Sequence, residues 1–254
     1  MRINKAIARA GVCSRRRADE LILAGAVQVN DVVVRERGLM LAPADELKVE
    51  GRRVEFWDLG SAAKSFIYIM MNKPVQVVCT AHDPEGRQTV LDLLQGQYVD
   101  RRLYPVGRLD YFSEGLLLLT DDGNLAARLM HPRYHLPKRY ELLARTEAEG
   151  ISEESLDIMR AGMTLSEGDK LAPVEVKRLK GRAEREHDRQ ELLELTLRQG
   201  VNRQIRRMCR DLNITVLRLV RTEEGPLTLG NLAKGQCREL TEDEIQALRF
   251  AVDL

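Results

Sequence analysis

The hydrophobic pattern of this 254-residue chain changes near residue 60, and the change predicts two domains. Residues 3–10 carry apolar side chains at helical spacing, and Ser14 is placed to cap a second helix over residues 15–24. Residues 27–34 then alternate between apolar and polar on either side of Asn30-Asp31, as in a tight hairpin. The N-terminal pattern therefore predicts a compact helix-helix-hairpin unit.

The stretch Gly60-Ser61-Ala62-Ala63 is typical of a linker, so we expect one domain over residues 1–60 and a larger one over residues 65–254. In the larger domain the pattern predicts strands at 66–71, 116–119, 192–197 and 216–220, and helices at 124–130 and 203–212. Few of these segments are joined by crossovers of βαβ length. We therefore expect an α+β fold with a largely antiparallel, mixed sheet.

Composition excludes several classes of protein. The 40 basic and 39 acidic residues leave a net charge of only +1, so the placement of charge, not its sum, must indicate any nucleic-acid partner. No run approaches the ~20 apolar residues of a membrane span, and we expect a soluble cytoplasmic protein. The four cysteines form no CxxC pair. His131 and His135 are interrupted by Pro132, so no metal site is expected.

Three consecutive arginines, Arg15, Arg16 and Arg17, occupy the first turn of the predicted second helix, where the helix dipole disfavours positive charge. Two interpretations remain open: a solvated basic face, or a site where an RNA phosphate relieves the conflict. The segment resembles the RNA-binding module named after ribosomal protein S4, at Arg2-Ile3-Asn4-Lys5 and at residues 10–16 and 25–30. This resemblance adds Lys5 to the candidate RNA contacts.

Asp110 lies in a loop flanked by Gly107 and Gly115, directly before a predicted buried strand. Such a loop can expose a reactive group on a rigid scaffold. The alternative is that Asp110 caps a turn and pairs with Arg108, two residues away. The local chemistry leaves both interpretations open.

A second basic stretch, residues 201–221, contains six arginines and one aspartate. At helical spacing, Arg203, Arg206, Arg207 and Arg210 are predicted to share one basic face. That face is either solvated or binds phosphate, and the use of arginine throughout favours recognition of phosphate or carboxylate by a planar fork.

Together these segments resemble the RsuA/RluB family of pseudouridine synthases along almost the whole chain. The matching motifs are Gly107-Arg108-Leu109-Asp110 with residues 113–123, residues 71–74 and 83–87, residues 131–133 and 138–141, and residues 202–208 and 217–219. Departures are Ser113 where threonine is usual, Asp122 where asparagine is common, and a charged segment at 180–189.

The resemblance implies the site. Asp110 matches the family's nucleophile, Tyr140 its stacking tyrosine, and Arg206 the basic residue that orients the aspartate. Arg108 is expected to hold the RNA strand where the target base has left it, and Arg203 and Arg207 to contact RNA. The reaction involves no net oxidation or reduction, and the substrate loses no group. No cofactor or metal is therefore expected.

The expected function is therefore isomerisation of a uridine to pseudouridine in ribosomal RNA, with the large-subunit 23S RNA favoured over the small-subunit 16S RNA. The expected partner is ribosomal RNA or a ribosome-assembly intermediate, and the expected state is a monomer. The main alternative is a non-catalytic, RNA-binding ribosome-assembly factor. A pure binder has no evident need for a carboxylate among RNA phosphates, which it would repel. An enzyme acting on transfer RNA or free uridine is a third possibility.

Overall fold

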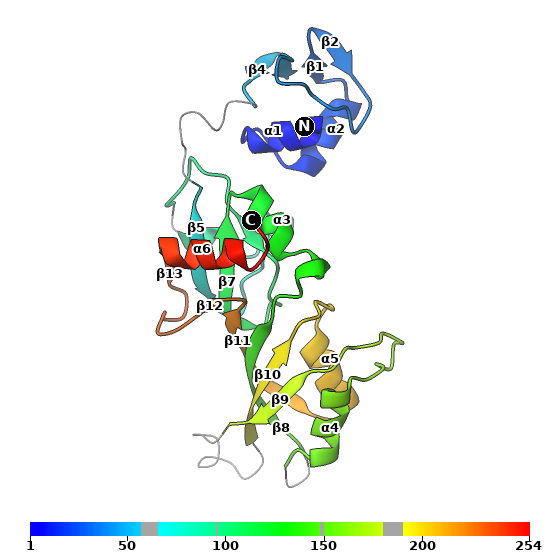
Figure 1. Ribbon diagram of the computed structural model, residues 1–254, viewed down its shortest axis with the longest axis vertical. Helices are drawn as coiled ribbons and strands as arrows, with labels where there is room; N and C mark the ends of the chain where they lie inside the picture. Colours follow the sequence, from blue (N-terminus) through cyan, green and yellow to red (C-terminus); the bar gives the residue numbers. More distant parts are fainter. Residues whose placement is uncertain (57–65, 95, 148–149, 180–189) are drawn as a thin grey trace. The chain divides into compact units, whose positions relative to one another are not determined.

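The computed structural model describes residues 1–56, 66–94, 96–147, 150–179 and 190–254. The chain forms two compact units, Met1–Phe66 with Asp100–Arg102, and Ile67–Val99 with Leu103–Leu254 (Figure 1). The expected linker at 60–63 and the charged segment at 180–189 lie outside the described residues. Within the part of the chain that is described, no helix is both long and apolar enough to cross a bilayer.

The first unit packs two helices against a small antiparallel sheet. Its elements are α1 (Ile3–Arg9), α2 (Arg15–Leu23), β1 (Val27–Val29), β2 (Val32–Val34), β3 (Leu47–Val49) and β4 (Arg52–Val54), with strand order β2-β1-β3-β4. The Ser14 hydroxyl accepts a hydrogen bond from the Arg17 backbone N–H at 3.0 Å, which confirms the predicted cap of α2. Ile3, Ile7 and Ile22 are fully buried in its core.

The first hairpin lies where the sequence predicted it, and the second, β3–β4, was not predicted. Both hairpins turn through two residues with positive φ, Asn30 and Asp31 at 50° and 65°, and Glu50 and Gly51 at 50° and 76°. This pair of left-handed residues is the turn that matches the twist of the flanking strands. The Glu50-Gly51 turn lacks the Asn-Gly or Asp-Gly signature, which explains why the second hairpin was missed.

The second unit is built on one continuous nine-stranded sheet of order β13-β5-β7-β11-β8-β10-β9, with β6 paired to β7 and β12 to β11. In chain order its elements are β5 (Tyr68–Lys73), η1 (Asp92–Leu94), β6 (Tyr104–Val106), β7 (Glu114–Thr120), α3 (Gly123–Leu129), η2 (Pro132–Tyr134), β8 (Lys138–Arg145), α4 (Glu153–Ala161), β9 (Glu175–Arg178), β10 (Gln190–Leu197), α5 (Gln204–Asp211), β11 (Thr215–Glu224), β12 (Leu227–Thr228), β13 (Cys237–Glu239) and α6 (Glu242–Phe250). Among the described strands, only β7 and β11 pair in parallel. The expected α+β class with a largely antiparallel sheet is confirmed.

The helices divide between the two halves of this sheet. Figure 1 shows α3 and α6 beside the half that contains β5 and β7, and α4 and α5 beside the half that contains β8, β9 and β10. In β5 and β7, successive side chains enter separate hydrophobic clusters on opposite faces, so both strands are apolar without alternation. Tyr140 on β8 packs against a cluster in each half.

The central strand β8 was not predicted as a strand because its sequence is polar. Its charged side chains are paired across the sheet: Arg139 Nη1 lies 2.9 Å from a Glu223 carboxylate oxygen, and Lys138 Nζ lies 3.9 Å from Glu224. Cross-strand charge pairs of this kind replace the apolar alternation that identifies a half-buried strand. Tyr140 therefore stands in the middle of the sheet between β11 and β10.

Candidate active site

Asp110 begins a tight turn, residues 110–113, immediately before the fully buried strand β7. The Ser113 backbone N–H donates to the Asp110 carbonyl at 3.0 Å, and the Gln76 N–H donates to the Tyr111 carbonyl at 2.7 Å. Gly107, with φ of +76°, bends the chain ahead of the turn. The Asp110 side chain is 26% exposed, so its carboxylate is accessible from solvent while its backbone is fixed.

The turn rests on Lys73, the last residue of β5, which has no solvent exposure. Its ammonium donates to the carbonyl oxygens of Pro74 at 2.8 Å, Ser113 at 2.9 Å and Asp110 at 3.2 Å. Burial lowers the pKa of Lys73, and nearby negative groups, among them Asp110, oppose that shift. Sequence reasoning did not select Lys73, although a lysine at the end of a strand that is otherwise buried was a usable signal.

Arg206, in the first turns of α5, holds the other side of the 110–113 turn. Its Nη2 donates to the Phe112 carbonyl at 2.7 Å and to the Ser113 hydroxyl at 3.3 Å, while its Nε lies 3.8 Å from Asp110 Oδ2. Burial lowers the pKa of Arg206, and the Asp110 charge raises it. Arg203 Nη1 also lies 3.8 Å from the same carboxylate oxygen. The sequence-predicted pair of Asp110 and Arg206 is thus brought together, with Arg203 beside it.

The four arginines of α5 do not form one shared face. Arg207 binds Glu167 at 2.9 Å and Asp169 at 2.5 Å, and Arg210 is paired with Glu167 and Asp211. These carboxylates neutralise Arg207 and Arg210. Of these four arginines, Arg203 and Arg206 are the two whose guanidinium groups lie beside the Asp110 carboxylate.

Tyr140 lies opposite Arg221 in the β8–β11 register. Burial raises the pKa of Tyr140, Arg221 opposes this shift, and the charges of Glu224 and Asp110 add to it, so the phenol is neutral near neutral pH. Of the two residues expected to act with Asp110, Arg206 lies 3.8 Å from its carboxylate, and Tyr140 packs against the cluster that contains Leu109, the residue before Asp110.

Arg221 is a buried residue that sequence reasoning did not select. It is 1% exposed, its Nε donates to the Leu116 carbonyl of β7 at 2.7 Å, and its Nη2 lies 3.2 Å from a Glu224 carboxylate oxygen. Its backbone passes so close to Gly115 that a Cβ there would lie 2.2 Å from the Arg221 carbonyl oxygen. Gly115, with φ of +104°, is therefore required for β7 and β11 to pair.

Glu114, the first residue of β7, is a buried carboxylate with two basic partners. Arg218 Nε lies 3.3 Å and Lys234 Nζ 3.1 Å from its oxygens. Burial raises the pKa of Glu114, but hydrogen bonds from Arg218 and Lys234 outweigh burial and hold it below its usual value. The first residue after the 110–113 turn is thus fixed by charge as well as by the sheet.

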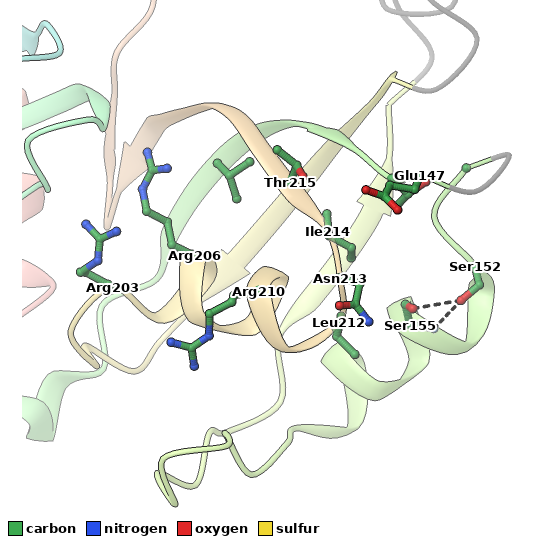
Figure 2. Close-up of a pocket in the computed structure, with 13 residues that line it drawn as sticks. Glu147, Ser152, Ser155, Arg203, Arg206, Arg210, Leu212, Asn213, Ile214 and Thr215 are labelled. Carbon is green, nitrogen blue, oxygen red and sulfur yellow. Dashed lines mark hydrogen bonds between the residues drawn. The ribbon is translucent and has the colours of Figure 1, made fainter.

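A pocket of about 850 Å³ opens beside α5 (Figure 2). Arg203, Arg206 and Arg210 line it from the helix, and the start of β11 and the first turn of α4 complete it. Figure 2 shows Arg203 and Arg206 at one end and Ser152 and Ser155 at the other. The remaining lining residues are Thr146, Glu147, Gly150, Leu212, Asn213, Ile214, Thr215 and Val216. The three arginines and the serine and threonine hydroxyls can bind phosphate, whereas Glu147, which also lines the pocket, would repel it.

The other predicted RNA contacts lie on the surface. Arg108 is exposed, and among the described residues no ion pair joins it to Asp110, so the alternative of an Arg108–Asp110 pair is not found. In the first unit Lys5, Arg15 and Arg16 are exposed, and Arg17 pairs with Glu20 at 2.8 Å. Each of these side chains is accessible to a large ligand.

The described residues contain no group of three side chains arranged to hold a metal ion. His131 caps η2, where its Nδ1 accepts a hydrogen bond from the Arg133 backbone N–H at 3.1 Å. His135 ends η2 in the left-handed conformation. The two histidines therefore have local structural roles.

Comparison with known proteins gives consistent matches. Residues 67–211 match the family model for RNA pseudouridylate synthase, and residues 1–47 match the S4 domain. The ribosomal large subunit pseudouridine synthase B of Bacillus subtilis is 39% identical over 99% of this chain and 97% of its own length. An uncharacterized RNA pseudouridine synthase of Aquifex aeolicus is 38% identical over 100% of this chain and 96% of its own length. A crystal structure of a pseudouridylate synthase covers 98% of this chain and 99% of its own, with a TM-score of 0.66 and 27% identity.

Proposed function

Because this chain belongs to the RNA pseudouridylate synthase family, we propose that it isomerises a specific uridine in large-subunit ribosomal RNA to pseudouridine. The large subunit is favoured over the small because the Bacillus subtilis relative, which aligns over nearly its whole length, carries that substrate in its name. An S4 domain joined to the synthase domain supports a structured RNA substrate over free uridine.

We assign Asp110 as the nucleophile. The reaction breaks the bond between ribose C1′ and uracil N1, rotates the ring, and forms a bond from C1′ to C5; the C5 proton leaves to solvent and N1 takes up a proton. A carboxylate supplies the electron pair, at the ribose or at the base, and is released when the product forms. The single observation that carries this assignment is the 110–113 turn. Lys73 and Arg206 fix its backbone from opposite sides and leave the Asp110 carboxylate accessible.

Arg206 and Tyr140 have separate roles in this proposal. Arg206 orients the Asp110 carboxylate, because its Nε lies 3.8 Å from Asp110 Oδ2. Tyr140 stacks on the uracil after it leaves the RNA helix, as an aromatic face receives a flipped base. Its raised pKa favours this role as a neutral ring over a role as a ready base for the C5 proton.

The RNA strand is assigned to the arginine-lined pocket and to the exposed basic residues. Arg203 faces both Asp110 and the pocket, so it is placed to bind a phosphate next to the target nucleotide. Arg108, two residues before Asp110, is exposed and is assigned to the RNA strand, and Lys5, Arg15, Arg16 and Arg17 supply affinity from the S4 domain. Arg207, already held by two carboxylates, is better suited to anchoring α5 than to the RNA contact expected from the sequence.

We further propose that the protein acts as a monomer in the cytoplasm on ribosomal RNA or on a ribosome-assembly intermediate. The test compares pseudouridine positions in ribosomal RNA from cells with and without the gene, and from deletion cells that express Asp110→Asn. We expect one or more large-subunit sites to vanish on deletion, return with the wild-type gene, and stay absent with Asp110→Asn. Restoration by Asp110→Asn would contradict the nucleophile and favour the non-catalytic assembly factor. If deletion removed pseudouridine only from small-subunit RNA, the proposal that the substrate is large-subunit RNA would be wrong.

A further inference from the structure

Phe112 presents an aromatic ring to solvent two residues after Asp110. Its exposure is 56%, whereas the nearby side chains of Leu109, Ser113 and Glu114 are buried. A single exposed apolar side chain is ordinary on a protein surface. Phe112 differs because its position is fixed beside a reactive carboxylate.

The backbone that carries the ring is held by two side chains, Arg206 and Lys73. The Phe112 carbonyl accepts from Arg206 Nη2 at 2.7 Å, and the carbonyls at both ends of its turn accept from Lys73. The Tyr111 ring meets the Phe112 ring edge-on, with 5.0 Å between centroids and an interplanar angle of 81°. The ring is therefore supported from one side by another aromatic side chain, while more than half of its surface stays open.

We propose that Phe112 forms a stacking subsite for a nucleobase adjacent to the target uridine. This inference rests on the proposed function. When the target base leaves the RNA stack to reach Asp110, its neighbours lose a stacking partner, and covering one of them offsets part of the unstacking free energy. A flat ring on a rigid turn can do this without the loss of conformational freedom that a mobile loop would suffer.

The subsite is distinct from the roles assigned to Tyr140 and Arg108. Tyr140 stands inside the sheet against both core clusters, where only a base already flipped can meet it. Arg108 is a charged side chain that precedes Asp110 in the chain, whereas Phe112 follows it. Because every nucleobase has an aromatic face, Phe112 contributes to opening the RNA and not to selecting its sequence.

The experiment uses the full-length protein and an in vitro transcript of large-subunit ribosomal RNA that carries tritium at uridine C5, and measures tritium release. Four variants are compared: Phe112→Ala, Phe112→Leu, Phe112→Trp and the control Phe250→Ala. Phe250 is the more exposed phenylalanine, at 86%, and lies at the end of α6 outside the candidate site. Thermal melting of each variant confirms the fold, which an exposed side chain leaves intact.

We expect Phe112→Ala to lower kcat/KM by about 5-fold to 150-fold, the equivalent of one stacked base. Phe112→Leu is expected to remain low because it is apolar but not flat, whereas Phe112→Trp and Phe250→Ala retain wild-type rates. Wild-type rates for Phe112→Ala, or equal rates for Phe112→Leu and Phe112→Trp, would overturn the stacking subsite alone. Absence of tritium release by the wild-type enzyme, from the transcript and from labelled ribosomal particles of cells that lack the gene, would overturn the proposed function together with the subsite.

Discussion

The arginines of α2 and those that surround the 110–113 turn differ in what holds them. Arg15 and Arg16 are exposed at a helix N-terminus, and Arg17 has one exposed carboxylate partner. Arg206 instead donates to the backbone of the turn and lies beside the Asp110 carboxylate. The α2 arginines supply positive charge from exposed side chains that can move. Arg206 instead fixes the backbone of the 110–113 turn and the Asp110 carboxylate. The same residue type should therefore show different mutational signatures in the two regions.

The largest effect is expected for Arg206→Ala. Without its guanidinium the 110–113 turn loses two hydrogen bonds and Asp110 loses its orienting partner, so we expect kcat/KM for tritium release to fall by about 100-fold. Arg207→Ala is the matched control on the same helix, since Arg207 is directed to Glu167 and Asp169. Equal losses of kcat/KM in the two variants would show that activity depends on the total positive charge of α5 and not on the position of Arg206.

Lys73→Met should lower stability more than any substitution of an exposed basic residue. The variant removes the ammonium donor from three carbonyl oxygens, of which that of Asp110 keeps the Ser113 N–H, and we expect a cost of about 1–3 kcal/mol in the free energy of unfolding. Lys177→Met, at a side chain 70% exposed, should change it by less than about 0.5 kcal/mol. Urea denaturation measures both. Similar midpoints for the two variants would mean that the turn does not depend on Lys73.

For α2 we expect a change in salt dependence without a change in catalysis. Replacing Arg15, Arg16 and Arg17 by alanine should reduce the slope of log affinity against log salt by about 2–3, with kcat unaltered. The control is Arg52→Ala with Arg53→Ala, which removes exposed arginines of β4 in the same unit. Filter binding at several salt concentrations gives the slope. A slope that stays at its wild-type value would leave the α2 arginines as solvated surface.

The smallest effect is a pH-dependent one at Glu114. Its folded-state pKa is lowered, so its ionised form stabilises the fold above the unfolded-state pKa near 4.5, and this stabilisation is lost as pH falls through the folded-state value. Glu114→Gln should therefore be about 1 kcal/mol less stable than wild type at pH 7, and the difference should shrink below about pH 4. Glu20→Gln, at the exposed pair with Arg17, should show almost no difference at either pH. A difference for Glu114→Gln that is constant with pH would contradict its ionic role.

Much of the architecture was predictable because it depends on local chemistry. The cap at Ser14, the turn at Asn30-Asp31 and the apolar run of β7 each have a signature within a few residues. The polar strand β8 was not predictable, because its charges are satisfied by neighbours 50 or more residues away in the chain. The hydrophobic periods of strands and helices, two and 3.6 residues, contain no information on such distant partners.

The candidate site divides in the same way. Asp110, Tyr140 and Arg206 were predicted through a resemblance that extends along the chain, whereas the 3.8 Å contact between Arg206 and Asp110 is visible only in the fold. Lys73 and Arg221 were missed because acceptors that satisfy their buried charges lie far away in the chain, although the position of Lys73 at the end of a buried strand was a signal. For Lys73 these are carbonyls up to 40 residues away, and for Arg221 one is the Leu116 carbonyl. The sequence also predicted a single arginine face on α5, whereas acidic residues of the 163–171 segment neutralise part of it.

Every residue of β7, from Glu114 to Thr120, is buried, and the 110–113 turn leads directly into it. Amide hydrogens of such a strand exchange with solvent only when much of the surrounding domain opens. The amide hydrogens of the turn should accordingly be among the slowest to exchange. We expect the turn to move little on the microsecond to millisecond timescale of a catalytic cycle. Entry of the uridine and departure of the product must then depend on rearrangement of the RNA. Turnover should then be faster at loosely folded RNA sites than at tightly folded ones, because opening of the RNA would limit the rate.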